Sequence, residues 1–241
     1  MRQMLNRVWL PTALTCVLWA LAATTANAVA IGATDSGWWD DTGFSTDLSF
    51  SNYIAGTWVY DPAIHELPGE PYDATTRNFF VFDLSGIGPV TSATLRISAG
   101  ASWVGTYELW DVDTFIPDVR QPGALDPAVY DDLGTGTSYG NIDLVNSTAP
   151  GPVIEIQLNA AALASINAND GCTLAPSVDC LWAIGGSFDP VALAAFTYAF
   201  SASGTGVREL VVTPVPEPTT ALLLGLGLTG LAVRRGRARA A

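Results

Sequence analysis

The sequence contains no lysine and only one histidine, His65, and this scarcity excludes several kinds of chemistry. A zinc site needs several histidine or cysteine ligands, which the chain does not supply. The segment Gly136–Gly140 (GTSYG) matches the Gly-x-Ser-x-Gly motif, which in hydrolases places a nucleophilic serine on a turn between a strand and a helix. No helix pattern follows Ser138, however, and His65 precedes this serine, whereas in hydrolases with this motif the catalytic histidine comes last in the chain. No glycine pattern of the nucleotide-binding type follows a strand and opens a helix. We therefore predict no catalytic residues and no metal ligands.

Positive charge is also scarce in residues 31–214, which contain four arginines and 22 acidic residues and therefore carry a net charge of −18. A surface of this sign repels nucleic acid and anionic lipid, so we expect neither as a partner of this region. The acidic stretches Asp35–Asp41 (DSGWWDD) and Asp111–Asp113 (DVD) offer oxygen ligands for a structural calcium ion. They do not follow the EF-hand spacing, so no calcium ligand is assigned and no other cofactor is expected.

The first 30 residues predict a secretory signal peptide. Arg2 and Arg7 give a positive start, and an apolar run follows them. Ala26–Ala28 (ANA) or Ala28–Ala30 (AVA) then offers the small-x-small pattern that signal peptidase accepts. We expect an N-terminal signal helix, export through the Sec pathway and cleavage after Ala28 or Ala30. The alternative is a membrane anchor that stays attached.

The last residues, 215–241, predict a membrane segment with three parts. The sequence Val215, Pro216, Glu217 and Pro218 comes first, and the uncharged, Leu- and Gly-rich Thr219–Val233 follows it. As a helix, Thr219–Val233 would span roughly 22 Å at ~1.5 Å per residue, less than a hydrocarbon core of ~30 Å. A basic cluster ends the chain and places the C-terminus on the cytoplasmic side; it consists of Arg234, Arg235, Arg237 and Arg239.

This order of elements resembles the PEP-CTERM sorting signal of Gram-negative bacteria, many of which make exopolysaccharide. The resemblance implies recognition by an exosortase, which cleaves near Pro216–Pro218. It also implies that the C-terminal transmembrane helix holds the chain transiently in the inner membrane, before the protein reaches the cell surface or the extracellular matrix. The alternative is an ordinary tail anchor, which needs no Pro-Glu-Pro sequence.

Two cysteines, Cys172 and Cys180, remain after removal of the signal peptide with Cys16. Export favours their oxidation, so we predict a disulfide between them. Closure of so short a loop would add about 2–3 kcal/mol in the chain-entropy description. The alternative, half of a metal site, would need further ligands.

Residues 31–214 predict one all-β domain, because apolar and polar residues alternate with period two in most of its apolar segments. Phe80, Phe82 and Leu84 fall on one face of a strand, and Phe79 and Val81 fall on the other. Because both faces are apolar, we predict that other parts of the domain pack against both faces of this strand. The predicted strands are RNFFVFDLS, TSATLRIS, GTYELWDVD, PVIEIQLN, LWAIGGSF, FTYAFSAS and RELVVT.

One short helix is expected in residues 159–171, with Asn159 as its N-cap and Gly171 as its stop. The segment Phe115–Gly140 is polar and weakly periodic, so we predict long loops there. Many short strands with few helices favour a two-sheet sandwich of the jelly-roll type.

Residues 77–100 (RNFFVFDLSGIGPVTSATLRISAG) resemble the signature of DNRLRE-type sandwich modules, some of which bind polysaccharide. The segments AVYDDLGTGTSYG and LWAIGGSF look more like uncharacterised exported domains that accompany PEP-CTERM tails. That second resemblance implies no particular chemistry.

Three functions follow as expectations. The first is a non-catalytic protein of the cell surface or biofilm matrix, processed by signal peptidase and exosortase. The second is a carbohydrate-binding module for exopolysaccharide, and the third is an exported glycoside hydrolase, because 22 acidic residues offer many carboxylate pairs. A strongly acidic domain would bind a uronate-rich polymer only through bridging calcium. Four tryptophans in or beside predicted loops are the candidate sugar-stacking residues: Trp38, Trp39, Trp58 and Trp103.

Overall fold

The computed structural model describes residues 27–43, 53–59, 73–99, 104–121, 125–145, 152–169, 180–190, 196–200, 206–215 and 227. The chain divides into two compact units, and the unit Ala28–Pro214 contains the ten strands that the structure describes. The predicted signal helix and the predicted membrane helix Thr219–Val233 lie outside the described residues, apart from Gly227. No helix among the described residues is both long enough and apolar enough to cross a membrane.

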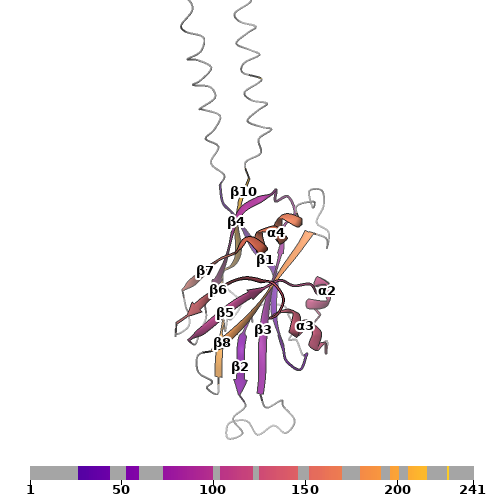
Figure 1. The fold of residues 1–241 in the computed structure, drawn as a ribbon, viewed down its shortest axis with the longest axis vertical. Helices are drawn as coiled ribbons and strands as arrows, with labels where there is room; N and C mark the ends of the chain where they lie inside the picture. Colours follow the sequence, from indigo (N-terminus) through magenta and orange to yellow (C-terminus); the bar gives the residue numbers. More distant parts are fainter. Residues whose placement is uncertain are drawn as a thin grey trace, which may run out of the picture. The chain divides into compact units, whose positions relative to one another are not determined.

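Ten strands and three short helices make up the described part of this unit (Figure 1). The helices are α2 (Ile116–Val119), α3 (Pro127–Asp132) and α4 (Ala160–Ala168). The strands are β1 (Val29–Asp40), β2 (Ala55–Val59), β3 (Asp73–Asp83), β4 (Val90–Ser98), β5 (Gly105–Trp110), β6 (Ser138–Leu144), β7 (Val153–Gln157), β8 (Leu181–Pro190), β9 (Phe196–Ala199) and β10 (Arg208–Pro214).

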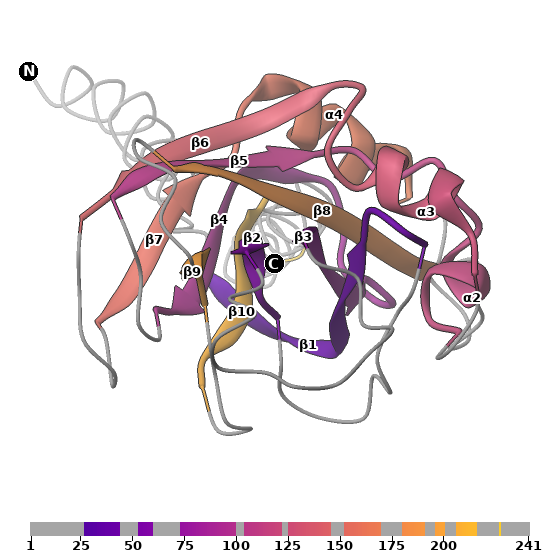
Figure 2. The same ribbon diagram turned by 90° about the horizontal axis from the view of Figure 1, so that it is seen from below.

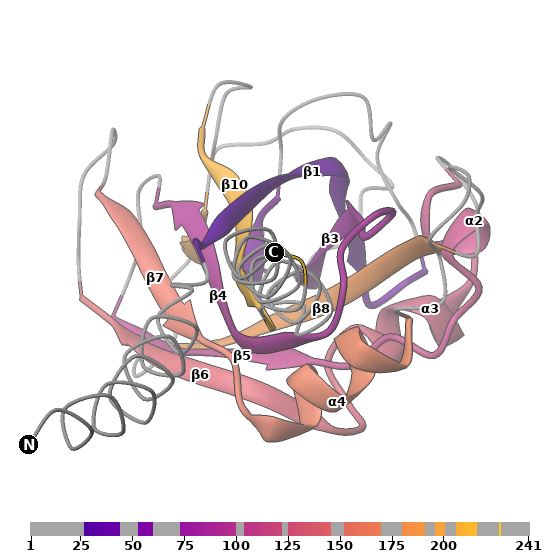
Figure 3. The ribbon, with the colours of Figure 1, turned by 90° about the horizontal axis from the view of Figure 1, so that it is seen from above.

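All ten strands belong to one hydrogen-bonded sheet in the order β6-β5-β8-β3-β1-β10-β4-β7, while β2 pairs with β3 and β9. The sheet curls until its two ends approach each other, so it is nearly closed into a barrel (Figures 2 and 3). Strand β1 allows the sheet to curl, because its first part, Val29–Gly32, pairs with β10 and its second part, Ala33–Asp40, pairs with β3. A register shift between Ala33 and Asp35 lies at the start of the stretch that pairs with β3, and such bulges bend a strand.

The prediction of a mostly β fold with few helices is confirmed, but its two-sheet jelly-roll form is not. A sandwich would need two separate sheets, whereas β1 carries the hydrogen-bonded ladder from one half of the molecule into the other. Sheets that meet at a corner through a shared, bent strand are a known alternative to separate layers. Period-two alternation cannot distinguish the two arrangements, because both have one interior and one exterior face.

Asn159 brings the two ends of the sheet together and also starts α4. Its backbone N–H donates to the carbonyl of Tyr139, next to the start of β6, at 2.9 Å, and its Nδ2 donates to the carbonyl of Ser138 at 2.7 Å. Its Oδ1 accepts from the N–H groups of Ala161 and Ala162, as an N-cap side chain does. The predicted helix with Asn159 as N-cap is therefore confirmed.

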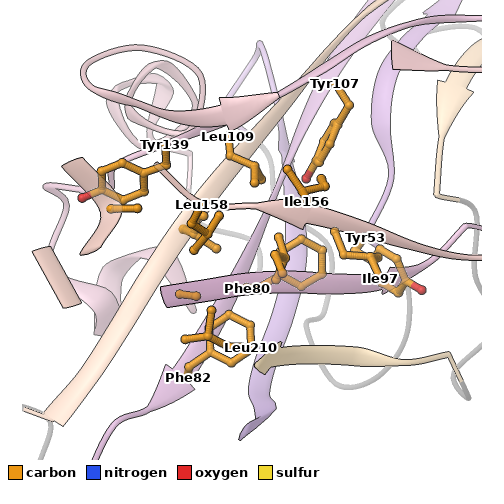
Figure 4. Packing of buried hydrophobic residues seen from close by; sticks show 14 of the residues in the cluster. Tyr53, Phe80, Phe82, Ile97, Tyr107, Leu109, Tyr139, Ile156, Leu158 and Leu210 are labelled. Atoms are coloured by element: carbon orange, nitrogen blue, oxygen red, sulfur yellow. The ribbon is translucent and has the colours of Figure 1, made fainter. Parts of the chain in front are cut away.

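The interior of the curled sheet is filled by apolar side chains from most of the strands (Figure 4). Phe80 and Phe82 of β3 are fully buried there, and the Phe80 ring lies 5.4 Å from the ring of Tyr53. The alternation predicted for β3 is confirmed, because Phe80, Phe82 and Leu84 all pack in this interior cluster, and β4, β5 and β7 also contribute alternate residues to it. The members drawn and labelled are Tyr53, Phe80, Phe82, Ile97, Tyr107, Leu109, Tyr139, Ile156, Leu158 and Leu210.

A second, smaller core covers the exterior face of β3, as the sequence predicted. Phe79 and Val81 pack there against Trp39 of β1 and against Val119 and Leu133 from the region of α2 and α3. The prediction of long loops over Phe115–Gly140 is wrong, because this segment contains α2, α3 and the start of β6. Helices of four and six residues are too short to show an amphipathic period in the sequence.

Candidate functional site

A groove opens on the exterior of the sheet where β8 leaves β3. Strand β8 pairs with β3 as far as the pair Asn78 and Gly186, and its second half pairs with β5 instead. Strand β2 pairs with the preceding residues of β3, Asp73–Thr76. The space between β2, β3 and the end of β8 has a volume of about 290 Å³, close to the lower end of the ~300–1,000 Å³ typical of small-molecule sites. We call it the β2–β8 groove.

Hydroxyl groups and one charge of each sign line the β2–β8 groove. One wall comes from β2 and β3 and the other from β8; the lining residues are Thr57, Thr75, Thr76, Arg77, Ser187, Phe188, Asp189 and Pro190. Asp189 is exposed and Ser187 is half-buried. The site therefore offers donors and acceptors on both walls, and Pro190 adds apolar surface to the β8 wall.

Arg77 is held in place by α3 rather than free to move. Its Nη1 donates to the carbonyls of Tyr130 and Asp131 at 2.9 and 3.0 Å, and its guanidinium carbon lies 4.2 Å from the centre of the Tyr130 ring. A side chain at Gly134 would collide with the guanidinium, so that position must stay small. Arg77 thus connects the groove to α3, and its Nη1 is already hydrogen-bonded to the carbonyls of Tyr130 and Asp131.

Trp110 lies beside the groove, on the same exterior face. Along β5 it alternates with Tyr107 and Leu109, which point into the interior, and it is only half-buried. Its indole N–H donates to Oγ of Ser187 at 2.9 Å, and Ser187 itself lines the groove. This hydrogen bond fixes an aromatic ring next to the hydroxyl-lined wall.

A buried polar triad supports the groove from the interior. The Tyr107 hydroxyl donates to Oδ1 of Asn78 at 2.7 Å, and Nδ2 of Asn78 donates to the carbonyl of Tyr53 at 2.8 Å. Burial raises the pKa of Tyr107 above its usual range, and the hydrogen bond to Asn78 offsets only part of this rise. The hydroxyl therefore stays protonated and remains a donor at the point where β8 separates from β3.

The four tryptophans predicted to stack on sugars have different positions, and none lines the groove with a described side chain. Trp39 is fully buried in β1, where its indole N–H donates to the carbonyl of Val119 at 2.9 Å, so it cannot present a face to a ligand. Trp38 is half-buried in β1, and its Nε1 is buried without a hydrogen-bond partner among the described residues. Trp58 lies in β2 with an undescribed side chain, and Trp103 lies outside the described residues.

Trp38 and Trp39 lie near the end of β1 and Trp58 near the end of β2, two strands that were not among those predicted from the sequence. The residue that sequence reasoning missed is Trp110. The alternation in GTYELW already places it on the face opposite Tyr107 and Leu109, and that was the available signal.

Of the predicted disulfide, only Cys180 belongs to the described residues. It is buried, with 1% of its surface exposed, at the residue before β8. Cys172 lies outside the described residues, so the disulfide stays a prediction. The sorting residues Pro216, Glu217 and Pro218 and the arginines at 234, 235, 237 and 239 lie there too, whereas Val215 follows β10 directly and is exposed.

The acidic stretches that suggested calcium have protein partners in the structure. Asp35 pairs with Nε of Arg120 at 2.6 Å, and Oδ1 of Asp40 accepts from the backbone and hydroxyl of Thr42. Oδ1 of Asp111 accepts from the Thr137 N–H at 2.6 Å. Among residues with described positions, no group of three or more His, Cys, Asp or Glu is arranged to hold a metal ion.

The Gly136–Gly140 segment has a structural role that explains its glycines. Gly136 has a φ of 101° and Gly140 a φ of 145°, which side chains rarely adopt. Ser138 is the first residue of β6, and β6 continues beyond it as a strand rather than a helix. The context of a nucleophile motif is therefore missing at this serine.

All four arginines of the Ala28–Pro214 unit make contacts within the protein. Besides Arg77 and Arg120, Arg96 on β4 faces Glu155 of β7 and Glu209 of β10, with ion-pair distances of 3.1 and 2.8 Å. Nη1 of Arg208 donates to Oγ of Ser36 at 2.7 Å. The positive charges are thus engaged, and the excess of acidic side chains sets the sign of the field around the unit.

Residues 214–237 match the PEP-CTERM protein-sorting motif. The chain carries an exosortase sorting signal. The PEP-CTERM motif indicates sorting by the exosortase pathway and implies a secreted protein that is anchored transiently in the membrane. None of the curated proteins matches the chain. The prediction of the sorting signal is confirmed, while the resemblance of residues 77–100 to DNRLRE-type modules stays a prediction.

Proposed function

We propose that this PEP-CTERM protein is a non-catalytic component of the cell surface or extracellular matrix, exported through the Sec pathway and processed by exosortase. The observation that carries the proposal is the sorting motif at residues 214–237. The β2–β8 groove supports the non-catalytic part, because Asp189 is the one carboxylate among its described lining residues. Glycoside hydrolysis, the predicted alternative, ordinarily needs a pair of carboxylates across the scissile bond.

The sorting step can be tested with Glu217→Ala in a host that has the exosortase. We expect the variant to keep its C-terminal tail and to stay in the inner-membrane fraction, because the enzyme reads the Pro-Glu-Pro sequence. The matched control is Glu70→Ala, which changes the other Glu-Pro pair of the chain, outside the motif. Mass spectrometry of the C-terminus in the membrane and surface fractions measures the result. Normal processing of Glu217→Ala would contradict the proposal.

The start of β1 favours one of the two signal-peptidase sites. Val29 and Ala30 pair with Val212 and Val211 of β10, so cleavage after Ala30 would remove two residues of the ladder. We therefore expect a mature N-terminus at Val29. Ala26→Gln should block cleavage after Ala28, because it alters that site alone, whereas Ala30→Gln should leave this cleavage intact. N-terminal sequencing of the exported protein decides, and Ile31 as its first residue would contradict this prediction.

Carbohydrate binding is the second candidate function, and the β2–β8 groove is the observation that favours it. Hydroxyl-lined walls with a carboxylate and an adjoining half-buried indole can hydrogen-bond sugar hydroxyls and pack against a sugar ring. A module of this kind at the cell surface would attach the protein to exopolysaccharide.

A further inference from the structure

We infer that the β2–β8 groove, together with Trp110, is a binding site for an uncharged glycan. This inference rests on carbohydrate binding, the second candidate function above. It adds the place of the site, the class of the ligand and the residues that recognise it.

The walls of the groove match a ligand with many hydroxyl groups. Thr57 and Thr75 face each other across the β2–β3 pair, and Ser187 and Asp189 stand on β8 opposite them. Each hydroxyl can donate and accept, and the Asp189 carboxylate accepts. A sugar hydroxyl also does both, so it can be matched on either wall without leaving a partner unsatisfied.

Trp110 supplies the apolar contact that sugar recognition also needs. Its hydrogen bond to Ser187 holds the indole beside the groove before any ligand arrives, so little side-chain freedom is lost on binding. The same hydrogen bond couples the ring to the groove wall. A sugar ring in the groove can therefore place its C–H face against Trp110 while its hydroxyls meet Ser187.

The charges around the groove select against an acidic ligand. Arg77 is the cation among its lining residues, and Nη1 of this arginine is already bound to two backbone carbonyls. Asp189 is exposed in the groove, and Glu108 lies opposite Ser187 on the neighbouring strand β5. A uronate would meet the Asp189 carboxylate in the groove, while Arg77, the cation among the described lining residues, is already engaged by α3, so we expect an uncharged ligand.

The test uses the full-length chain, purified in a mild detergent, and three uncharged polymers: dextran, a β-1,3-glucan and a galactomannan. Affinity electrophoresis measures the dissociation constants, and polygalacturonate in chelator is the acidic comparison. We expect binding to at least one uncharged polymer, with a change in tryptophan fluorescence that Trp110→Phe abolishes. Thr57→Val and Asp189→Asn should each weaken binding roughly 3- to 10-fold, as the loss of a hydrogen bond predicts.

Two matched substitutions outside the groove serve as controls. Thr94→Val changes a threonine on the exterior of β4, and Asp118→Asn changes an exposed aspartate on α2. Both should bind as the unmodified chain does. Thermal unfolding of every variant shows whether a loss of binding reflects a loss of fold.

The outcomes separate the site from the function. Binding to an uncharged polymer that the groove variants leave unchanged would overturn the site and keep carbohydrate binding. Binding to polygalacturonate alone would overturn the ligand class. Absence of binding to every polymer would overturn both the site and the second candidate function, while the sorting test above would be unaffected.

Discussion

Phe80→Ala is expected to lower the free energy of unfolding by about 3–5 kcal/mol, the usual cost of truncating a fully buried phenylalanine. Phe80 has no exposed surface, and its ring packs at the centre of the interior cluster, against Tyr53. The loss combines the transfer free energy of the ring with the cavity left inside a sheet that closes around it. Urea denaturation followed by tryptophan fluorescence measures the change as a shift in midpoint.

Phe115→Ala is the matched control for this prediction. Phe115 precedes α2 and has 62% of its surface exposed, so the same truncation removes much less buried area. Its effect should stay within about 0.5 kcal/mol, as for most surface substitutions. Equal losses for the two variants would contradict the placement of Phe80 inside the curled sheet.

Gly186→Ala is expected to cost about 2–5 kcal/mol, although it adds only one methyl group. The new Cβ would collide with the Tyr107 hydroxyl and with Oδ1 of Asn78, where β8 turns from β3 to β5. Overpacking a core costs about 1–3 kcal/mol, and separating the buried Tyr107–Asn78 hydrogen bond adds a similar amount. Because the Tyr107–Asn78 hydrogen bond lies behind the β2–β8 groove, its disruption should also reduce glycan binding.

Two further variants identify the cause. Gly32→Ala also adds a methyl group within a strand, but no atom lies within 4 Å of its Cβ, so stability should hardly change. In a Tyr107→Phe background the hydroxyl is gone, and Gly186→Ala should cost less than in the unmodified chain. Thermal unfolding of the unmodified chain, of Gly186→Ala, of Tyr107→Phe and of the double variant gives this coupling. Additive losses would contradict a collision with the hydroxyl.

Most strands that the sequence predicted alternate strongly, whereas β1, which the sequence missed, does not. In β4, Ala93, Leu95 and Ile97 are all buried and the residues between them are not, so the pattern was readable. Strand β1 contains Gly, Asp and Ser, which disfavour strands, and its conformation comes from pairing with β10 and β3, far away in the sequence. Long-range pairing of this kind is invisible to a local pattern.

The candidate site depends even more on such long-range features. Its walls come from β2, β3 and β8, and the groove exists because β8 changes partners at Gly185 and Gly186. The two glycines were visible in LWAIGGSF, but their consequence needs the positions of β3 and β5. Trp39 shows the opposite case, because a tryptophan expected to be exposed is covered by the region of α2, whose shortness hid it from the sequence.

The pairing of β10 has a mechanical consequence. Strand β10 ends at Pro214, and the sorting motif follows it in the chain, so any pull from a membrane-held tail enters the domain along this strand. Its edges are hydrogen-bonded to β1 and to β4, and these bonds run across the direction of the strand. A tension along β10 therefore shears many bonds at once instead of opening them one by one, so the anchoring strand is suited to bear load.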